Sequence, residues 1–159
     1  MFKKILVAIN NTEVSRHVFE QALSLARLTN AELMILQVIS PLNDDFINTS
    51  TTEIDSRNNL TQSQNAEGNL REWEKLKQQG IEFLRLLTNQ AIAKGIVAEF
   101  NQELGEPSRM ICEVAKNCHI DVIVIGHCTK SGLTELFLGS VSNYVLHHAP
   151  CSVLTVLNY

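Results

Sequence analysis

The feature that most constrains this chain is an amphipathic segment placed between two short apolar runs in the first 40 residues. Residues 3–9 are rich in aliphatic side chains and end at the polar turn Asn10-Asn11-Thr12, as a buried strand does. Residues 15–29 then carry apolar side chains at helical spacing, and Asn30 suits the end of a helix. Residues 32–39 are a second apolar run. The order strand, helix, strand predicts two parallel strands joined by a right-handed crossover.

The rest of the chain repeats this alternation after one polar interruption. Residues 41–69 are dominated by Asn, Asp, Ser, Thr and Gln and predict a mobile insertion or long loop. The elements predicted after it are a helix from residue 70 to Gly95, a strand at 96–102, a helix at 107–117, a strand at 120–125, a helix at 139–148 and a strand at 151–157. Five strands alternating with four helices predict one α/β domain over residues 1–159, built as a doubly wound parallel sheet.

The loops after the first and fourth predicted strands are the expected ligand site, because doubly wound sheets bind ligands beyond the carboxyl ends of their strands. The loop after the fourth strand, residues 126–142, contains Gly126, Gly132 and Gly139 and leads into a helix start rich in small residues. Unpaired backbone N–H groups and the helix dipole at such a start attract a phosphate. The pattern points to nucleotide binding, although glycines also serve tight turns, which leaves a purely structural role open.

Charge and hydropathy exclude several classes of function. The 159-residue chain has a formal net charge of -4 and a pI near 5.7, so it offers no basic field for a nucleic-acid backbone. No segment approaches the roughly 20 apolar residues of a membrane span, and the first apolar run is too short for a signal peptide. We therefore expect a cytoplasmic protein that binds neither nucleic acid nor a membrane.

The cysteines and histidines show no pattern typical of a disulfide framework, a metal site or a nucleophile. The four cysteines are Cys112, Cys118, Cys128 and Cys151, and they contain no CxxC pair. Cys112 and Cys118 with His119 fall short of a four-ligand zinc site, and Cys112 falls on the apolar side of its predicted helix. Cys128 has only the neighbouring His127 as a base, and His147-His148 suit the negative end of a helix dipole. We predict no disulfide, no metal site and no catalytic residue.

Several enzyme classes are also disfavoured by motifs that the chain lacks. It has neither the Gly-x4-Gly-Lys-Ser/Thr phosphate loop nor the three-glycine dinucleotide fingerprint after the first strand. It has no Gly-x-Ser-x-Gly elbow. A pyrophosphatase of the adenine-nucleotide α/β group would carry Ser-Gly-Gly after the first strand, where this chain has Asn10-Asn11-Thr12.

Five segments together resemble the universal stress protein family, and the resemblance runs over essentially the whole chain with residues 41–69 as the variable region. These segments are Ile5-Leu6-Val7-Ala8-Ile9, Gly105-Glu106-Pro107, Asp121-Val122-Ile123-Val124-Ile125-Gly126, Leu138-Gly139-Ser140-Val141-Ser142 and His148-Ala149-Pro150-Cys151-Ser152-Val153-Leu154. The resemblance implies a parallel sheet of strand order 3-2-1-4-5 with helices on both faces.

The nucleotide-binding branch of that family carries Gly, two residues, Gly, nine residues, Gly and Ser or Thr. The matching positions are Gly126, Thr129, Gly139 and Ser140, so a threonine replaces the second glycine, and Asn10 replaces the usual aspartate. The resemblance implies an ATP or AMP site, with Mg²⁺ accompanying ATP and at most weak hydrolysis. Carried over by position, the residues flanking adenine and ribose are Ala8, Ile9, Asn10 and Val38, and those holding phosphates are Gly126, His127, Thr129, Gly139, Ser140, Val141 and Ser142.

The last predicted strand is the expected dimer contact, because family members often pair it across a two-fold axis. It begins at Cys151 and ends at Leu157, and an apolar edge strand is a liability unless another chain covers it. The leading hypothesis is a stress-response homodimer that binds an adenine nucleotide and signals through an unknown protein partner. The alternative is a nucleotide-free interaction module in which Thr129 fills the phosphate space.

Overall fold

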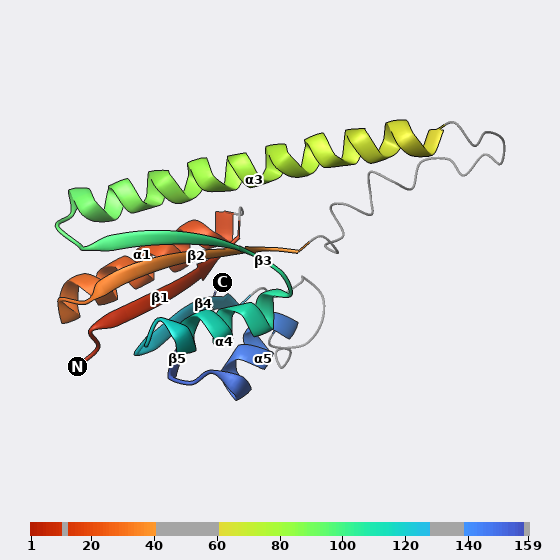
Figure 1. The fold of residues 1–159 in the computed structure, drawn as a ribbon. Helices are drawn as coiled ribbons and strands as arrows, with labels where there is room; N and C mark the ends of the chain where they lie inside the picture. The colour runs from red at the N-terminus through yellow and green to blue at the C-terminus, as the bar shows by residue number, and fades with distance from the viewer. Residues whose placement is uncertain (11–12, 41–60, 128–138, 158–159) are drawn as a thin grey trace.

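The computed structural model describes residues 1–10, 13–40, 61–127 and 139–157, and these residues form a five-stranded, all-parallel sheet (Figure 1). The strands are β1 (Lys4–Ile9), β2 (Glu32–Ile39), β3 (Ala98–Leu104), β4 (Val122–His127) and β5 (Ser152–Leu157). The helices are α1 (Glu13–Thr29), α3 (Thr61–Ala93), α4 (Pro107–Asn117) and α5 (Ser140–His148). The strand order is β3-β2-β1-β4-β5, which confirms the predicted order 3-2-1-4-5.

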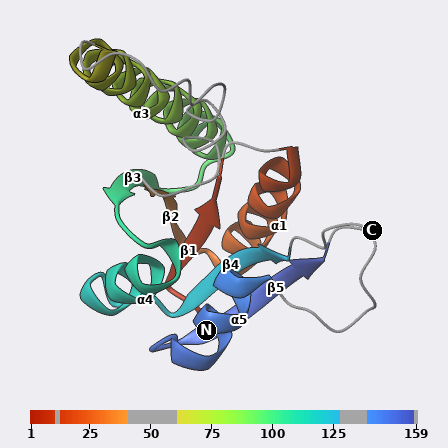
Figure 2. The same cartoon turned by 90° about the vertical axis from the view of Figure 1, so that its right-hand side faces the viewer.

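Helices cover both faces of the sheet, and each pair of helices encloses its own apolar cluster (Figure 2). Alternate residues of each strand point to opposite faces, so β1 contributes to both clusters. The α1/α3 cluster includes Ile5, Val7 and Ile9 of β1 with Val18 and Ala22 of α1 and Leu84 and Leu87 of α3. The α4/α5 cluster includes Leu6 of β1, Ile123 and Ile125 of β4, Ile111 and Val114 of α4 and Val145 of α5. The doubly wound architecture is therefore confirmed.

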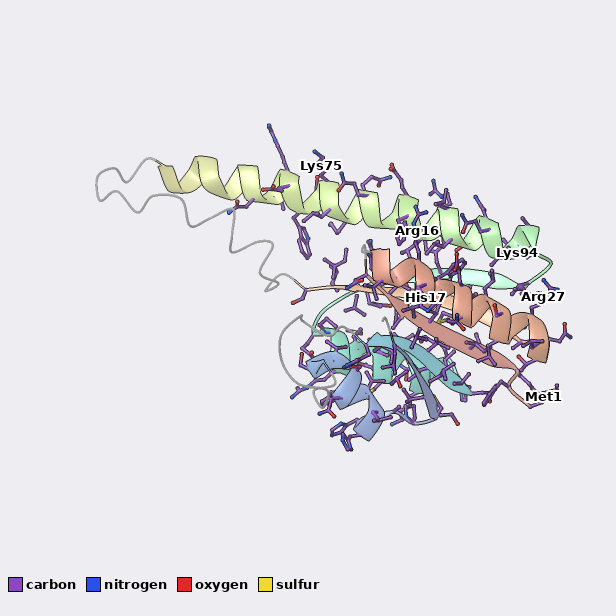
Figure 3. The ribbon with its side chains drawn as sticks, turned by 180° about the vertical axis from the view of Figure 1, so that it is seen from behind. Met1, Arg16, His17, Arg27, Lys75 and Lys94 are labelled. Carbon is purple, nitrogen blue, oxygen red and sulfur yellow. The ribbon has the colours of Figure 1, made fainter. Side chains whose placement is uncertain are left out.

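Helix α3 begins nine residues earlier than we predicted, which corrects the expectation of a loop through residue 69. It starts at Thr61 and runs for 33 residues to Ala93, past the ends of the strands (Figure 1). Figure 3 shows Lys75 on the part of α3 that projects beyond the start of α1, and Lys94 at the opposite end. Buried residues of α3 begin at Gly80, so its C-terminal half carries the contact with the sheet.

A polar contact at Gly80 fixes how α3 lies on the sheet. The side-chain amide of Gln102 on β3 donates to Oε1 of Gln37 on β2 and to the backbone oxygen of Lys77, each at 3.0 Å. A Cβ at Gly80 would lie 2.5 Å from Nε2 of Gln102 and even closer to Oε1 of Gln37. The glycine therefore lets the helix approach the two glutamines closely.

Two strand boundaries also differ from the prediction by two residues. β3 covers 98–104 rather than 96–102, and β4 covers 122–127 rather than 120–125. Gly126 and His127 therefore belong to a strand and not to the loop after it. A glycine at the end of an apolar run reads as a strand terminator in sequence, but here it continues the pairing of β4 with β5.

Asp121 joins three strands at their amino-terminal ends. Its Oδ2 accepts the backbone N–H groups of Lys3 and Lys4 at 2.7 and 2.8 Å, and its own backbone oxygen accepts the N–H of Ser152 at 3.3 Å. The two N–H groups at its carboxylate lower the pKa of Asp121. One residue thus links the starts of β1, β4 and β5.

Local caps define the ends of α1 and α4. The Glu106 carboxylate accepts the backbone N–H groups of Ser108 and Arg109 at 3.1 and 3.0 Å and caps the start of α4, with Pro107 in its first turn. Asn30 after α1 and His119 after α4 adopt the left-handed conformation, with φ of 55° and 53°. The predicted helix end at Asn30 is confirmed.

In the part of the chain that the structure describes, no helix combines the length and the apolar composition needed to cross a membrane.

Candidate functional site

The predicted ligand site lies at the carboxyl ends of the strands, where the strand order reverses between β1 and β4. Chain connections run outward from β1 to β2 and β3 on one side and from β4 to β5 on the other. Ala8 of β1 pairs with Ile125 of β4, and Ile9 pairs with Gln37 of β2. The carboxyl ends of β2, β1 and β4 therefore lie side by side, as the general rule for ligand sites in such sheets requires.

The predicted site residues divide between the two faces of the sheet. Ala8, Val38 and Val141 pack against the α4/α5 cluster, each partly buried. Ile9 is 7% exposed and belongs to the α1/α3 cluster, so its side chain points away from α5. Strand alternation explains this division, because Ala8 and Ile9 are consecutive in β1. Thr129 lies outside the described residues.

Gly126 faces α1 rather than the start of α5. A Cβ at Gly126 would lie 2.7 Å from Cγ2 of Val18 and 3.6 Å from Cγ1 of Val14. Among the described glycines, only Gly95 and Gly105 have positive φ, so Gly126 is not needed for a turn. Close packing of α1 on β4 is the structural reason for a glycine at this position.

Asn10 is held by the first turn of α1. Its backbone N–H donates to Ser15 Oγ at 3.0 Å, and the Ser15 hydroxyl donates back to Asn10 Oδ1 at 2.6 Å. Ser15 is 3% exposed. Sequence reasoning missed Ser15, although a serine inside the first turn after a polar loop is a recognisable sign of such a contact. The reciprocal pair fixes the direction in which the chain leaves β1.

His127 and Gly139 bring the end of β4 and the start of α5 together. The backbone N–H of Gly139 donates to Nδ1 of His127 at 3.4 Å, across twelve residues of sequence. His127 is 8% exposed. Because a backbone N–H can only donate, Nδ1 acts as the acceptor, and the neutral imidazole carries its proton on Nε2. The family resemblance implied that both residues would lie near a phosphate, but not that they would bind each other.

The start of α5 has no side-chain cap in the part of the chain that the structure describes. Gly139 is the N-cap residue, with φ −53° and ψ 151°, and as a glycine it has no side chain to accept the first N–H groups. Ser140 is exposed, whereas Ser142 is 3% exposed and its hydroxyl donates to the Gly139 oxygen at 3.0 Å. The φ and ψ of Gly139 are accessible to any residue. Gly139 itself places no side chain over the main chain of the helix start.

The described cysteines and His148 make packing and hydrogen-bond contacts within the fold. Burial raises the pKa of the Cys112 and Cys151 thiols, and both side chains pack against the α4/α5 cluster. The placement of Cys112 on the apolar side of its helix is thus confirmed. His148 Nδ1 lies 2.9 Å from the Tyr144 oxygen, and its ring stacks on Tyr144 at 3.9 Å. These contacts at the end of α5 agree with the interpretation of His148 as a residue that suits the helix terminus.

A hollow between α1 and α3 is too small to be an alternative ligand site. Its volume is about 110 Å³, and Arg16 and Lys94 contribute to its lining (Figure 3). Pockets for cofactors and drug-sized ligands occupy about 300–1,000 Å³. The carboxyl ends of β1 and β4 therefore remain the candidate site.

The sheet is open and doubly wound, and its strand order reverses between β1 and β4. The start of α5 lies beside this reversal point. The profile of the universal stress protein family matches residues 1–156. Universal stress protein Sll1388 of Synechocystis is 34% identical over 155 residues, which cover 98% of this chain and 97% of that protein. Universal stress protein YxiE of Bacillus subtilis is 33% identical over 169 aligned residues, covering 98% and 99%. The chain belongs to the universal stress protein family.

Solved structures share the fold at low sequence identity. Universal stress protein UspA from Lactobacillus plantarum has a TM-score of 0.74 at 19% identity, with 98% of this chain and 97% of that chain covered. Three further structures contain nucleotides. They are an Arabidopsis thaliana family protein with AMP (TM-score 0.66, 19% identity, 99% and 92% covered), a universal stress protein with cAMP (0.67, 21%, 98% and 97%) and one from Archaeoglobus fulgidus with dAMP (0.59, 18%, 97% and 97%).

Proposed function

We propose that this universal stress protein binds an adenine nucleotide, ATP or AMP, in a cytoplasmic sensing or signalling role. The AMP, cAMP and dAMP complexes of structurally similar proteins support adenine as the base. The observation that carries the proposal is the uncapped start of α5 beside the end of β4. We assign no catalytic residue to the site.

The start of α5 supplies the chemistry for a phosphate. Apart from the bond from Gly139 to His127, the N–H groups at the start of α5 have no side-chain cap in the described part of the chain, and the helix dipole adds about half a positive charge there. Gly139 presents no side chain over these groups, although its backbone conformation would allow one. Ala8 and Val38 lie partly buried at the neighbouring strand ends and offer apolar contacts to a base. Mg²⁺ would accompany ATP through the phosphates.

Isothermal titration of nucleotide-stripped protein with ATP, ADP and AMP tests this proposal. We expect binding by the native protein and at least tenfold weaker binding by Gly139→Val, because the isopropyl group would cover the helix start. Gly68→Ala is the matched control, since nothing lies within 4 Å of a Cβ at Gly68 on the distant α3. The absence of heat with all three nucleotides at millimolar concentration would refute the proposal.

The second candidate is an interaction module without a nucleotide, and the threonine at position 129 favours it. In this case Thr129 occupies the space of the second motif glycine and prevents phosphate binding. Thr129→Gly separates the two candidates. If the native protein gives no heat and the variant binds ATP, the threonine blocks a site that the fold retains.

We also propose that β5 pairs with β5 of a second copy to form a homodimer. In the described sheet β5 is an end strand that pairs with β4, and Leu154 and Leu157 on it are 41% and 47% exposed. An exposed apolar edge strand readily adds another strand. Light scattering should give twice the mass of the chain for the native protein and the monomer mass for Thr155→Pro, which removes a backbone donor. A native monomer at micromolar concentration would contradict the dimer.

A further inference from the structure

The N–H of Gly139, the first backbone donor at the start of α5, is already occupied in the structure. It donates to Nδ1 of His127, whose ring is 8% exposed. A buried N–H without an acceptor costs about 1–3 kcal/mol, so an acceptor stabilises this position when no ligand is bound. The imidazole supplies that acceptor from the end of β4.

We propose that His127 is a positioning residue that holds the Gly139 N–H in the nucleotide-free protein and gives it up to a phosphate. This inference rests on the proposed nucleotide site. The donor–acceptor distance of 3.4 Å is at the long end for an N–H bond, whereas a charged phosphate oxygen forms shorter bonds of about twice the strength. A phosphate therefore displaces the imidazole, but a ligand without one has no means to do so.

The geometry gives His127 a role in setting how tightly a ligand with a phosphate binds. Binding of a nucleotide at Gly139 exchanges one hydrogen bond for another, and the affinity is reduced by the strength of the bond that is lost. Adenosine, which bears no phosphate, leaves the bond between His127 and Gly139 intact. The affinity difference between AMP and adenosine should thus depend on whether residue 127 can accept a hydrogen bond.

The test compares AMP and adenosine binding to the native protein, His127→Phe and His127→Asn by titration calorimetry. Phenylalanine keeps a planar ring but removes the acceptor, so we expect AMP affinity to rise about three- to tenfold, with adenosine unchanged. Asparagine restores an acceptor near the position of Nδ1 and should return AMP affinity toward the native value. Weaker or unchanged AMP binding by His127→Phe, with native binding intact, would overturn the role of His127.

A measurement on the native protein keeps the inference testable if His127→Phe does not fold. Nitrogen-15 NMR of labelled histidine should show the Nε2–H tautomer for His127, with its Nδ1 signal and the Gly139 amide signal both moving when AMP is added. A ligand-free His127 with its proton on Nδ1 would overturn the inference. Absence of ATP, ADP and AMP binding by every variant would instead overturn the proposed function, and the proposed competition at Gly139 with it.

Discussion

Val18 on α1 occupies the space that a side chain at Gly126 of β4 would need. A Cβ at Gly126 would lie 2.7 Å from Cγ2 of Val18, and real Cβ atoms do not approach other atoms that closely. Val18 is 2% exposed and, as a β-branched residue, has little rotamer freedom. The contact sets how closely α1 lies on the strand that leads into the candidate site.

Gly126→Ala should therefore destabilise the protein by about 1–3 kcal/mol through overpacking. Urea denaturation followed by circular dichroism measures the change. Val18→Ala removes the clashing methyl groups, so the double variant should lose less stability than the sum of the two single variants. Strict additivity of the two single effects would show that the two positions do not contact each other.

Gly80 and Gly68 form a matched pair within α3. Gly80→Ala places a Cβ against the side chains of Gln37 and Gln102, whereas a Cβ at Gly68 meets nothing within 4 Å. Gly68→Ala should stabilise the protein by up to about 1 kcal/mol through helix propensity, and Gly80→Ala should destabilise it. We expect about 2 kcal/mol between the two variants in denaturant unfolding. Equal effects would mean that the glutamines yield without loss of their hydrogen bonds.

His119→Gly should raise the melting temperature. His119 is exposed and holds φ at 53°, a left-handed conformation that costs a non-glycine residue about 1 kcal/mol. For a domain of this size, that energy corresponds to about 2–4 °C, which calorimetry resolves. His119→Ala keeps the unfavourable backbone and is the control. A larger gain with alanine than with glycine would point to a side-chain effect instead.

The Glu106 cap predicts an acid-dependent loss of stability. The Ser108 hydroxyl lies 2.7 Å from both carboxylate oxygens, and this hydrogen bond is the main cause of the lowered pKa of Glu106. A lowered pKa in the folded state stabilises the protein above the unfolded value of about 4.3, and this stability is lost as pH falls through the folded value.

Glu106→Gln should accordingly be less stable than the native protein by about 1 kcal/mol at pH 7, with the difference shrinking as pH falls below the unfolded value of about 4.3. Denaturant unfolding across this pH range measures it. Glu113→Gln removes a carboxylate from the same helix without touching the cap, so its effect should stay under about 0.5 kcal/mol. A difference for Glu106→Gln that does not change as pH falls would rule out the carboxylate as its source.

The alternation of strands and helices follows from patterns that are local in sequence, whereas the strand order came from the family resemblance. Each strand is a short apolar run, and α1 and α4 have apolar faces at helical spacing. Residues 61–69 lack such a face because their side chains are polar, so only propagation from the packed half of α3 explains a helix there. Gly126 was read as the end of a strand because its reason lies in Val18, more than one hundred positions away in the chain.

The sequence located the candidate site at the ends of the strands, but it did not give the directions in which the side chains point. Alternation along β1 would have shown that Ile9 and Ala8 point to opposite faces. The hydrogen bond from Gly139 to His127 has no sequence signal, since it depends on how α5 returns to the end of β4. Ser15 likewise contacts Asn10 only because α1 begins directly after the turn.

Because Asp121 joins the starts of β1, β4 and β5, we expect the two ends of these strands to differ in their dynamics. With the starts of β1, β4 and β5 tied to one residue, amide hydrogen exchange should be slowest at that end. Opening events should then be more frequent at the carboxyl ends of the strands, where Asn10, His127 and Gly139 lie. We expect solvent to reach that end while the starts of the strands stay paired.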